Sequence, residues 1–194
     1  MRGAGTGVTG TSDGCTFACT PWTSTAGTFT CRLVSLAAVG GTSIANGAKV
    51  GLMARANLAS SAATVFLDVA AGRGAHFMAR AVDTLNIADT HQSPATQASG
   101  LFGNTFIMSD NSKPAANYLL RPVWLRLTLS VDTWTAFTSL DGVHWTQVGT
   151  HGVEAVGAWV GLAVTSHQSG HYVQAVFDHV TGFQPDTFVR IGSV

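Results

Sequence analysis

Four polar side chains on three consecutive predicted strands between residues 49 and 82 could together bind a ligand. They are Arg55, Asp68, His76 and Arg80, and each alternates with apolar neighbours, so each strand presents them on one face. On one sheet face these groups could donate and accept hydrogen bonds from the hydroxyl groups of a sugar. They could instead form an ion-pair network between strands, with an arginine bidentate to an aspartate. The sequence favours this second interpretation.

An aromatic platform for a sugar ring is a further requirement, and Trp22 is the candidate. It lies beside Pro21 in a predicted turn, where its ring could be exposed. The other tryptophans are interpreted as core or sheet-covering residues because each is predicted in a regular strand; they are Trp124, Trp134, Trp145 and Trp159.

Catalysis of glycoside hydrolysis needs two carboxyl groups on either side of the scissile bond. The chain has one glutamate, Glu154, with no acidic residue within a few positions, and Asp68 stands alone on its strand. Residues 10–14 (GTSDG) match the spacing Gly-x-Ser-x-Gly, but they lie in a Gly/Thr-rich run with no helix expected after them, so they are not a strand–turn–helix nucleophile motif. The sequence therefore predicts that the protein is not an enzyme.

No cofactor is expected, apart from a structural calcium ion that loop carboxylates could bind. Asp13 and Asp178 are the candidate ligands, because carboxylate and carbonyl oxygens are the groups that calcium prefers. Neither lies in an acidic cluster. The three cysteines form at most one disulfide within the chain. Cys19 would face Cys31 if their segments formed a hairpin, although three buried thiols are an equally good interpretation.

The elements that position these residues are short strands. Alternation over 123–129 and again over 134–139 predicts two antiparallel strands, and Asp141-Gly142 predicts a tight hairpin after them. The segment 139–145 resembles the Asp-box hairpin of sialidases, one residue short, and is expected to stabilise that turn. About a dozen such strands without an amphipathic helix predict an all-β, two-sheet antiparallel β-sandwich in a single domain, 1–194.

Composition limits the possible partners. Charged residues make up 10% of the chain and the net charge is zero, which argues against nucleic-acid binding. No apolar run approaches the roughly 20 residues of a membrane span, so no membrane insertion is expected. Residues 1–14 form a Gly/Thr-rich N-terminal arm that a second chain could hold. Residues 83–121 are predicted to be a long loop insertion.

Six segments in order resemble the concanavalin A-like lectin/glucanase superfamily, and more closely the laminin-G-like jelly-roll modules of bacterial secreted proteins. These segments are residues 10–13, 48–55, 122–127, 139–145, 160–166 and 177–180. The resemblance implies a jelly roll of the kind often appended to carbohydrate-active enzymes. The chain departs from the family pattern in three ways. Its first strand is missing, although residues 187–191 or a second chain could supply it. The connection 83–121 is longer than usual, and the family generally has few cysteines at the positions of Cys15, Cys19 and Cys31.

Two functions follow as expectations. The first is a non-catalytic extracellular module that binds carbohydrate or mediates adhesion. The alternative is a structural subunit of a virion, fibre or cell-surface assembly built from jelly-roll protomers. A glycan is the expected ligand in the first case, and a homo-oligomer joined through residues 1–14 in the second. Either function places the protein outside the cell or on a cell or virion surface.

Overall fold

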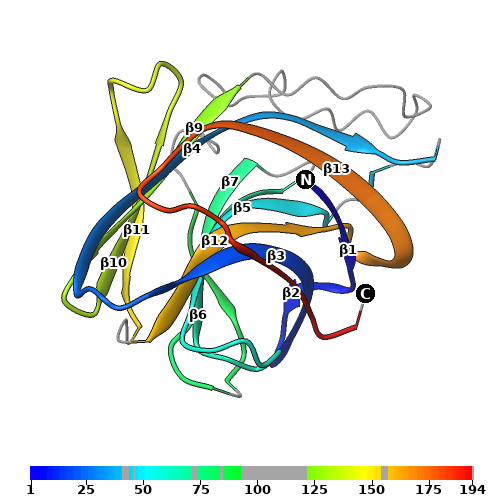
Figure 1. The fold of residues 1–194 in the computed structure, drawn as a ribbon, viewed down its shortest axis with the longest axis horizontal. Helices are drawn as coiled ribbons and strands as arrows, with labels where there is room; N and C mark the ends of the chain where they lie inside the picture. The colour runs from blue at the N-terminus through cyan, green and yellow to red at the C-terminus, as the bar shows by residue number, and fades with distance from the viewer. Residues whose placement is uncertain are drawn as a thin grey trace.

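The computed structural model describes residues 1–40, 44–45, 47–70, 74–83, 85–92, 122–153 and 157–193. Its regular elements are all strands, and they form two antiparallel sheets packed face to face (Figure 1). The predicted fold class is therefore confirmed: the described residues form an all-β, two-sheet antiparallel β-sandwich. Among the described residues, no helix has the length and apolar character to cross a membrane.

The first sheet has six strands in the order β1-β13-β4-β9-β10-β11. Their bounds are Arg2–Gly5 (β1), Gln168–Thr181 (β13), Ala26–Ala38 (β4), Val123–Ser130 (β9), Thr133–Ser139 (β10) and Thr146–Gly152 (β11). The two predicted strands around 123–139 are thus β9 and β10, paired in register from Thr133 opposite Ser130 to Ser139 opposite Trp124.

The second sheet has eight strands, with seven in the order β14-β3-β12-β5-β6-β7-β8 and β2 paired to β3. Their bounds are Thr187–Ile191 (β14), Ser12–Trp22 (β3), Ala158–Thr165 (β12), Lys49–Arg55 (β5), Thr64–Ala70 (β6), Gly74–Arg80 (β7), Ala88–Gln92 (β8) and Gly7–Thr9 (β2). Strands β6 and β7 pair as a hairpin, with Asp68 directly opposite His76.

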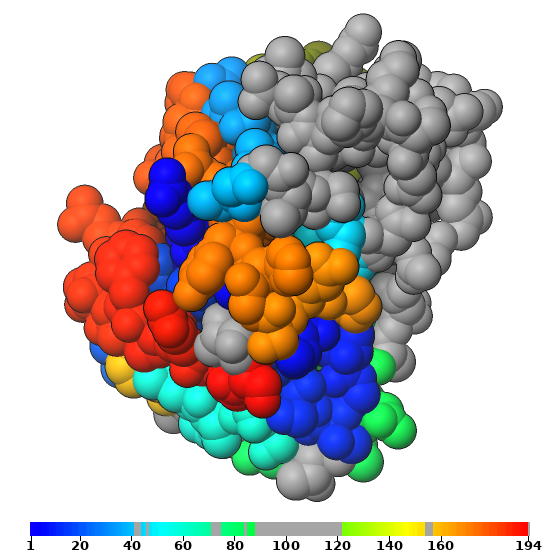
Figure 2. Space-filling view, turned by 90° about the vertical axis from the view of Figure 1, so that its right-hand side faces the viewer, coloured from blue at the N-terminus to red at the C-terminus, as the bar shows by residue number. Residues whose placement is uncertain are grey.

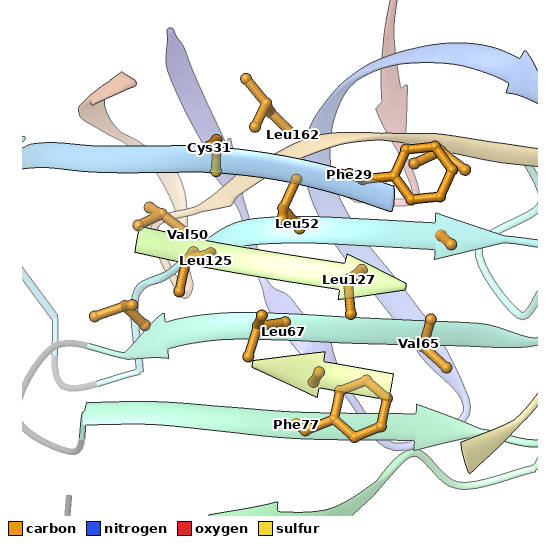
Figure 3. Packing of buried hydrophobic residues seen from close by; sticks show 14 of the residues in the cluster. Phe29, Cys31, Val50, Leu52, Val65, Leu67, Phe77, Leu125, Leu127 and Leu162 are labelled. Atoms are coloured by element: carbon orange, nitrogen blue, oxygen red, sulfur yellow. The ribbon is translucent and has the colours of Figure 1, made fainter. Parts of the chain in front are cut away.

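The main core lies between the two sheets. Alternate residues of each strand enter it, such as Val65 and Leu67 from β6 and Leu125 and Leu127 from β9, and all four are fully buried (Figure 3). Trp134 is the largest side chain there, and its indole N–H donates to the Val153 carbonyl oxygen at 3.1 Å. A buried tryptophan with a satisfied N–H stabilises a core without a polar cost.

The opposite face of the eight-stranded sheet carries a second cluster of buried apolar side chains, here called the outer cluster. Its members are Val8, Cys15, Phe17, Cys19, Met53, Phe66, Met78, Ala163 and Ile191. Leu58 and Ile87 pack against them from the segments that follow β5 and β7. This face of the sheet is therefore covered.

The N-terminal arm predicted for residues 1–14 is wrong, because this segment belongs to the sheets of its own chain. β1 pairs with β13, β2 pairs with β3, and Val8 is part of the outer cluster. Figure 2 shows the blue N-terminal and red C-terminal segments on the same face of the molecule, where Thr6 N–H donates to the Ser193 carbonyl oxygen at 3.3 Å.

The loop predicted for residues 83–121 is wrong in its first part. Ala88–Gln92 forms strand β8 beside β7, with a register shift between Phe77 and Met78. Residues 93–121 lie outside the described residues. Strand β14 (187–191), which was expected to supply the missing strand unless a second chain did, forms an edge of the eight-stranded sheet beside β3.

Candidate functional site

The predicted polar patch divides into two buried groups. In the first, Arg55 and Arg80 both bind Asp13, although the sequence suggested Asp68 as the partner. Arg80 is bidentate, with Nη2 at 2.7 Å from Asp13 Oδ1 and Nη1 at 2.9 Å from Oδ2, and Arg55 Nη1 donates to the same Oδ2. All three side chains have 0% exposure. The ion-pair interpretation is thus confirmed for both arginines.

Asp13 reaches these arginines because the β2–β3 hairpin packs over the outer cluster. The backbone N–H of Asp13 donates to the Ser60 carbonyl oxygen at 2.8 Å, and the Gly10 carbonyl oxygen accepts from Arg80 Nη2 at 3.1 Å. Further guanidinium N–H groups donate to carbonyl oxygens, those of Asn57 and Ala59 for Arg55 and those of Ala62 and Leu85 for Arg80. A buried charge is tolerated only when it is paired and hydrogen-bonded in this way. This group fixes the hairpin, and a calcium ion at Asp13 would have to displace both guanidinium groups.

The second group is Asp68 and His76. They lie directly opposite each other on β6 and β7, with His76 Nδ1 at 3.5 Å from Asp68 Oδ1, and their exposed fractions are 0% and 2%. The four predicted residues therefore share a sheet face, as the alternation indicated, but they do not form an open patch. A ligand in solution has no access to them in this structure.

Trp22, the predicted platform, is half-buried. Its ring packs edge-on against Phe29, with centroids 4.8 Å apart and an interplanar angle of 81°, and it lies against the main core. The expectation of an exposed platform at Trp22 is therefore wrong, because the turn that follows it leads the chain directly from one sheet to the other.

Of the two alternatives for the cysteines, the possible Cys19–Cys31 disulfide does not form, and both residues are buried free thiols, as is Cys15. Their segments do not form the expected hairpin, since β3 and β4 belong to different sheets. Cys19 faces the outer cluster and Cys31 faces the main core. Burial raises the pKa of Cys15 to about 12 and that of Cys19 to about 11. The buried-thiol interpretation holds.

A solvent-accessible arrangement of mostly half-buried aromatic and charged side chains lies instead on the outward face of the six-stranded sheet. We call it the Trp–Arg face, and it consists of Arg32, Trp124, Arg126, Trp145, Asp178 and His179. Its residues occupy the outward positions of β13, β4 and β9 and the end of the loop before β11.

One row of this face crosses three strands. Asp178 on β13 lies opposite Arg32 on β4, which lies opposite Trp124 on β9. Arg32 is bidentate to Asp178, at 2.8 Å through Nε and 2.5 Å through Nη2, and its guanidinium lies 5.6 Å from the Trp124 ring centroid. The arginine hydrogen bonds hold the pKa of Asp178 well below its ordinary value. His179 packs against Trp124 at 4.9 Å between ring centroids.

The next row contains the second stack. Arg126 lies opposite Thr30 on β4 and Phe137 on β10, and its guanidinium lies 3.6 Å from the Trp145 ring centroid. Its Nε donates to Thr30 Oγ1 at 3.4 Å. No described carboxylate pairs with Arg126, and burial lowers its pKa. Among the described residues no further group accepts a hydrogen bond from its other N–H donors, so a ligand could pair with them.

A third row is made of hydroxyl groups. Thr28, Thr128, Thr135 and Thr150 lie opposite one another on four adjacent strands. Thr150 Oγ1 donates to Thr135 Oγ1 at 3.0 Å, and all four side chains are exposed or half-buried. Polar hydroxyls thus continue the face beyond the two tryptophan stacks.

The loop between β10 and β11 borders this face. Asp141 accepts hydrogen bonds from the N–H groups of Val143 and His144, both at 2.8 Å, and its Oδ2 lies 2.7 Å from His144 Nδ1. The Trp145 indole N–H donates to the Gly142 carbonyl oxygen at 3.2 Å, which fixes the tryptophan of the stack. The turn-stabilising role predicted for 139–145 is confirmed.

Asp178 was the other calcium candidate, and its carboxylate already binds Arg32 and His179. The described residues contain no group of three or more histidine, cysteine or acidic side chains that could hold a metal ion. Sequence reasoning missed the Trp–Arg face, although its signal was present. Trp124 and Arg126 occupy the alternate, outward positions of the most regular predicted strand.

No family model matches the chain, and neither does any curated protein. Among solved structures, it is similar to a functionally unknown protein from Saccharomyces cerevisiae, at 14% identity and a TM-score of 0.45, over 83% of this chain and 71% of that chain. It is also similar to a xylan β-1,4-xylosidase from Bacillus halodurans C-125, at 12% identity and a TM-score of 0.47, over 79% of this chain and 27% of the xylosidase.

A third similar structure is the metal-free lectin I-B4 from Griffonia simplicifolia, at 12% identity and a TM-score of 0.39, over 78% of this chain and 70% of the lectin. The chain spans only about a quarter of the xylosidase. These likenesses concern the fold alone, and the resemblance to laminin-G-like modules stays a prediction.

Proposed function

We propose that the protein is a non-catalytic extracellular module that binds carbohydrate, or mediates adhesion to it, through the Trp–Arg face. The observation that supports this most directly is the stack of Arg126 on Trp145, with guanidinium donors that no described carboxylate occupies. The stack lies on a solvent-accessible sheet face, whereas the equivalent face of the other sheet is covered by the outer cluster.

The chemistry of the face suits a sugar. A pyranose ring has an apolar face of C–H groups, which packs on an aromatic ring, and a rim of hydroxyl groups, which pair with planar donors and acceptors. Trp124 and Trp145 supply aromatic surface, and Arg126 supplies a fork of N–H donors. The threonine row adds hydroxyl groups along the same sheet.

The non-catalytic part of the proposal rests on the carboxylates. Hydrolysis by the usual mechanism needs one protonated and one ionised carboxyl group beside the sugar. Asp13 and Asp68 are buried, and the two carboxyl groups at the Trp–Arg face are held ionised, Asp178 by Arg32 and Asp141 by His144, because these hydrogen bonds lower their pKa values. Glu154, the sole glutamate, lies outside the described residues.

A second candidate function is a structural subunit of a virion, fibre or cell-surface assembly. Its original basis was an arm of residues 1–14 reaching a second chain, and these residues are used within their own chain. What favours it now is the exposed edge strand β14 with Phe188 at 70% exposure. An assembly on this basis would join subunits through β14.

The test is binding of the purified chain to an array of neutral and anionic glycans, followed by calorimetric titration of the best ligand. Arg126→Met and Trp145→Ala should each weaken binding at least about tenfold, since each removes one or two hydrogen bonds or a stacking surface. Leu85→Ala, at an exposed apolar residue that follows β7 of the other sheet, is the control and should leave binding unchanged. Failure of the whole array, or equal binding by all variants, would overturn the proposal.

A further inference from the structure

Strand β14 forms one edge of the eight-stranded sheet. It pairs with β3 on one side, from Thr187 opposite Cys19 to Ile191 opposite Cys15. No described strand pairs with its other side. An edge strand presents a row of backbone N–H and C=O groups that can pair with another strand.

The side chains of this edge form a short alternating pattern. Asp186, Phe188 and Arg190 are spaced two residues apart, so they point to the same face, and all three are exposed. Asp186 accepts a hydrogen bond from Thr187 Oγ1 at 3.1 Å, and neither charged residue forms an ion pair with a described residue. An acidic group, an aromatic ring and a basic group thus follow one another along an open edge.

We propose that two copies of the chain form a two-fold dimer by antiparallel pairing of their β14 strands, centred on Phe188. In this register Phe188 faces Phe188 of the second copy, and Asp186 of each copy faces Arg190 of the other. A two-fold interface brings the same surface of both copies together. A strand that carries an acidic, an aromatic and a basic residue in this order is therefore complementary to a second copy of itself in antiparallel orientation. Aromatic and opposite-charge pairs directly across strands stabilise a sheet.

The charges select this register. Moving the centre by one residue to Val189 would place Phe188 opposite Arg190 and Asp186 opposite Gly192, so both ion pairs would be lost. The opposite face of β14 is compatible with the same register. There Thr187 of each copy would face Val189 of the other, and both are small β-branched residues that suit a sheet.

The dimer goes beyond the proposed function and would change how that function operates. A two-fold axis perpendicular to the joined sheet keeps both six-stranded sheets on the same side of it. The two Trp–Arg faces would then point in the same direction, and a surface carrying many glycans could be bound twice. Bivalent attachment of this kind raises apparent affinity without any new contact.

The experiment measures the mass of the full-length chain by light scattering and sedimentation. The monomer is 20.1 kDa. The wild-type chain is expected at twice this mass at high concentration, and Asp186→Arg and Arg190→Asp are each expected as monomers, because each places like charges across both pairs. Thermal unfolding of each variant identifies loss of folding as a separate cause.

Mixing provides the decisive control. An equimolar mixture of the two single variants should form a heterodimer, since both cross-strand pairs then join an arginine of one variant to an aspartate of the other. The chain with both substitutions should dimerise like the wild type, because exchanging the two charges within one strand restores its self-complementarity.

Three outcomes would overturn the proposal. They are a wild-type chain that stays monomeric, variants that dimerise regardless of charge, and monomeric single variants that mixing does not rescue. None of these outcomes depends on glycan binding, so the two proposals can fail separately.

Discussion

Arg80 donates two hydrogen bonds to the carboxylate of Asp13, which lies 67 residues earlier in the chain. The contact ties the β2–β3 hairpin to the end of β7, and Arg55 at the end of β5 joins it. It is a fully buried arrangement of one carboxylate and two guanidinium groups.

Replacement of Asp13 by asparagine should therefore destabilise the protein strongly. Two buried guanidinium groups would lose the counter-charge that they share, and removal of one partner of a buried ion pair costs about 3–5 kcal/mol. Asp178→Asn is the matched control, because Asp178 makes the same bidentate contact with Arg32 at a half-exposed position, where such pairs contribute about 0.2–1 kcal/mol. Urea unfolding measures both, and equal losses would contradict the role of burial.

Gly182 should not tolerate a side chain. Its φ is +88°, and a Cβ there would lie 2.0 Å from the Thr28 carbonyl oxygen. Gly182→Ala should cost about 1–2 kcal/mol for the left-handed backbone and about 1–3 kcal/mol more for overpacking. Gly157→Ala is the control, with φ +76° and no atom within 4 Å of the added Cβ. If thermal unfolding shows the two variants equally stable, the close approach at Thr28 is not significant.

The cysteines should be unreactive until the protein unfolds. All three are buried, and burial raises their pKa values, so little thiolate forms at neutral pH. Titration with a thiol reagent should find no reactive group in the native protein and three per chain in denaturant. Rapid reaction of one thiol under native conditions would show that the outer cluster or the main core opens readily.

The pair Asp141–His144 predicts a pH dependence for the β10–β11 loop. The hydrogen bond from His144 holds the pKa of Asp141 below its ordinary 3.8, and Asp141 raises the pKa of His144 above 6.5. The aspartate contributes stability above about pH 3.8 that is lost as the pH falls toward its lowered pKa. The histidine contributes stability below about pH 6.5 that is lost as the pH rises through its raised pKa. The pair is therefore strongest between these values.

An NMR titration of the His144 ring protons checks this prediction. In Asp141→Asn the pKa of His144 should fall toward 6.5, because the charge of Asp141 that raises it is lost. A His144 pKa that is the same in both proteins would show that the contact does not persist in solution.

The sequence allowed the strands of this fold to be predicted, but not most of the contacts between residues far apart in the chain. Alternation along β9 identifies Leu125 and Leu127 as core and leaves Trp124 and Arg126 outside, because a strand turns successive side chains to opposite faces. Asp13 has no such pattern, since it lies in a Gly/Thr-rich run and its partners are 42 and 67 residues away. A long-range partner of this kind depends on how the sheets are assembled.

The two errors at Cys19 and Trp22 have one physical cause. Residues close in sequence were expected to pair as a hairpin, but the turn before β4 takes the chain from the eight-stranded to the six-stranded sheet. Crossing between sheets sends Cys19 to the outer cluster and Cys31 to the main core. Nothing in the local alternation separates a turn within one sheet from a turn between two.

The position of β3 also determines when the chain can complete its fold. The first residues of β3 pair with β2, but the two strands that pair with the rest of β3, β12 and β14, come from the last part of the chain, between Ala158 and Ile191. During synthesis β3, with its apolar residues Cys15 and Phe17, therefore lacks these two partner strands until well over a hundred further residues have been added. Long-range pairing of this kind is slow and leaves apolar strands exposed to aggregation. The protein would therefore reach its native state only after its C-terminal strands leave the ribosome, and conditions that shield nascent chains should improve its yield.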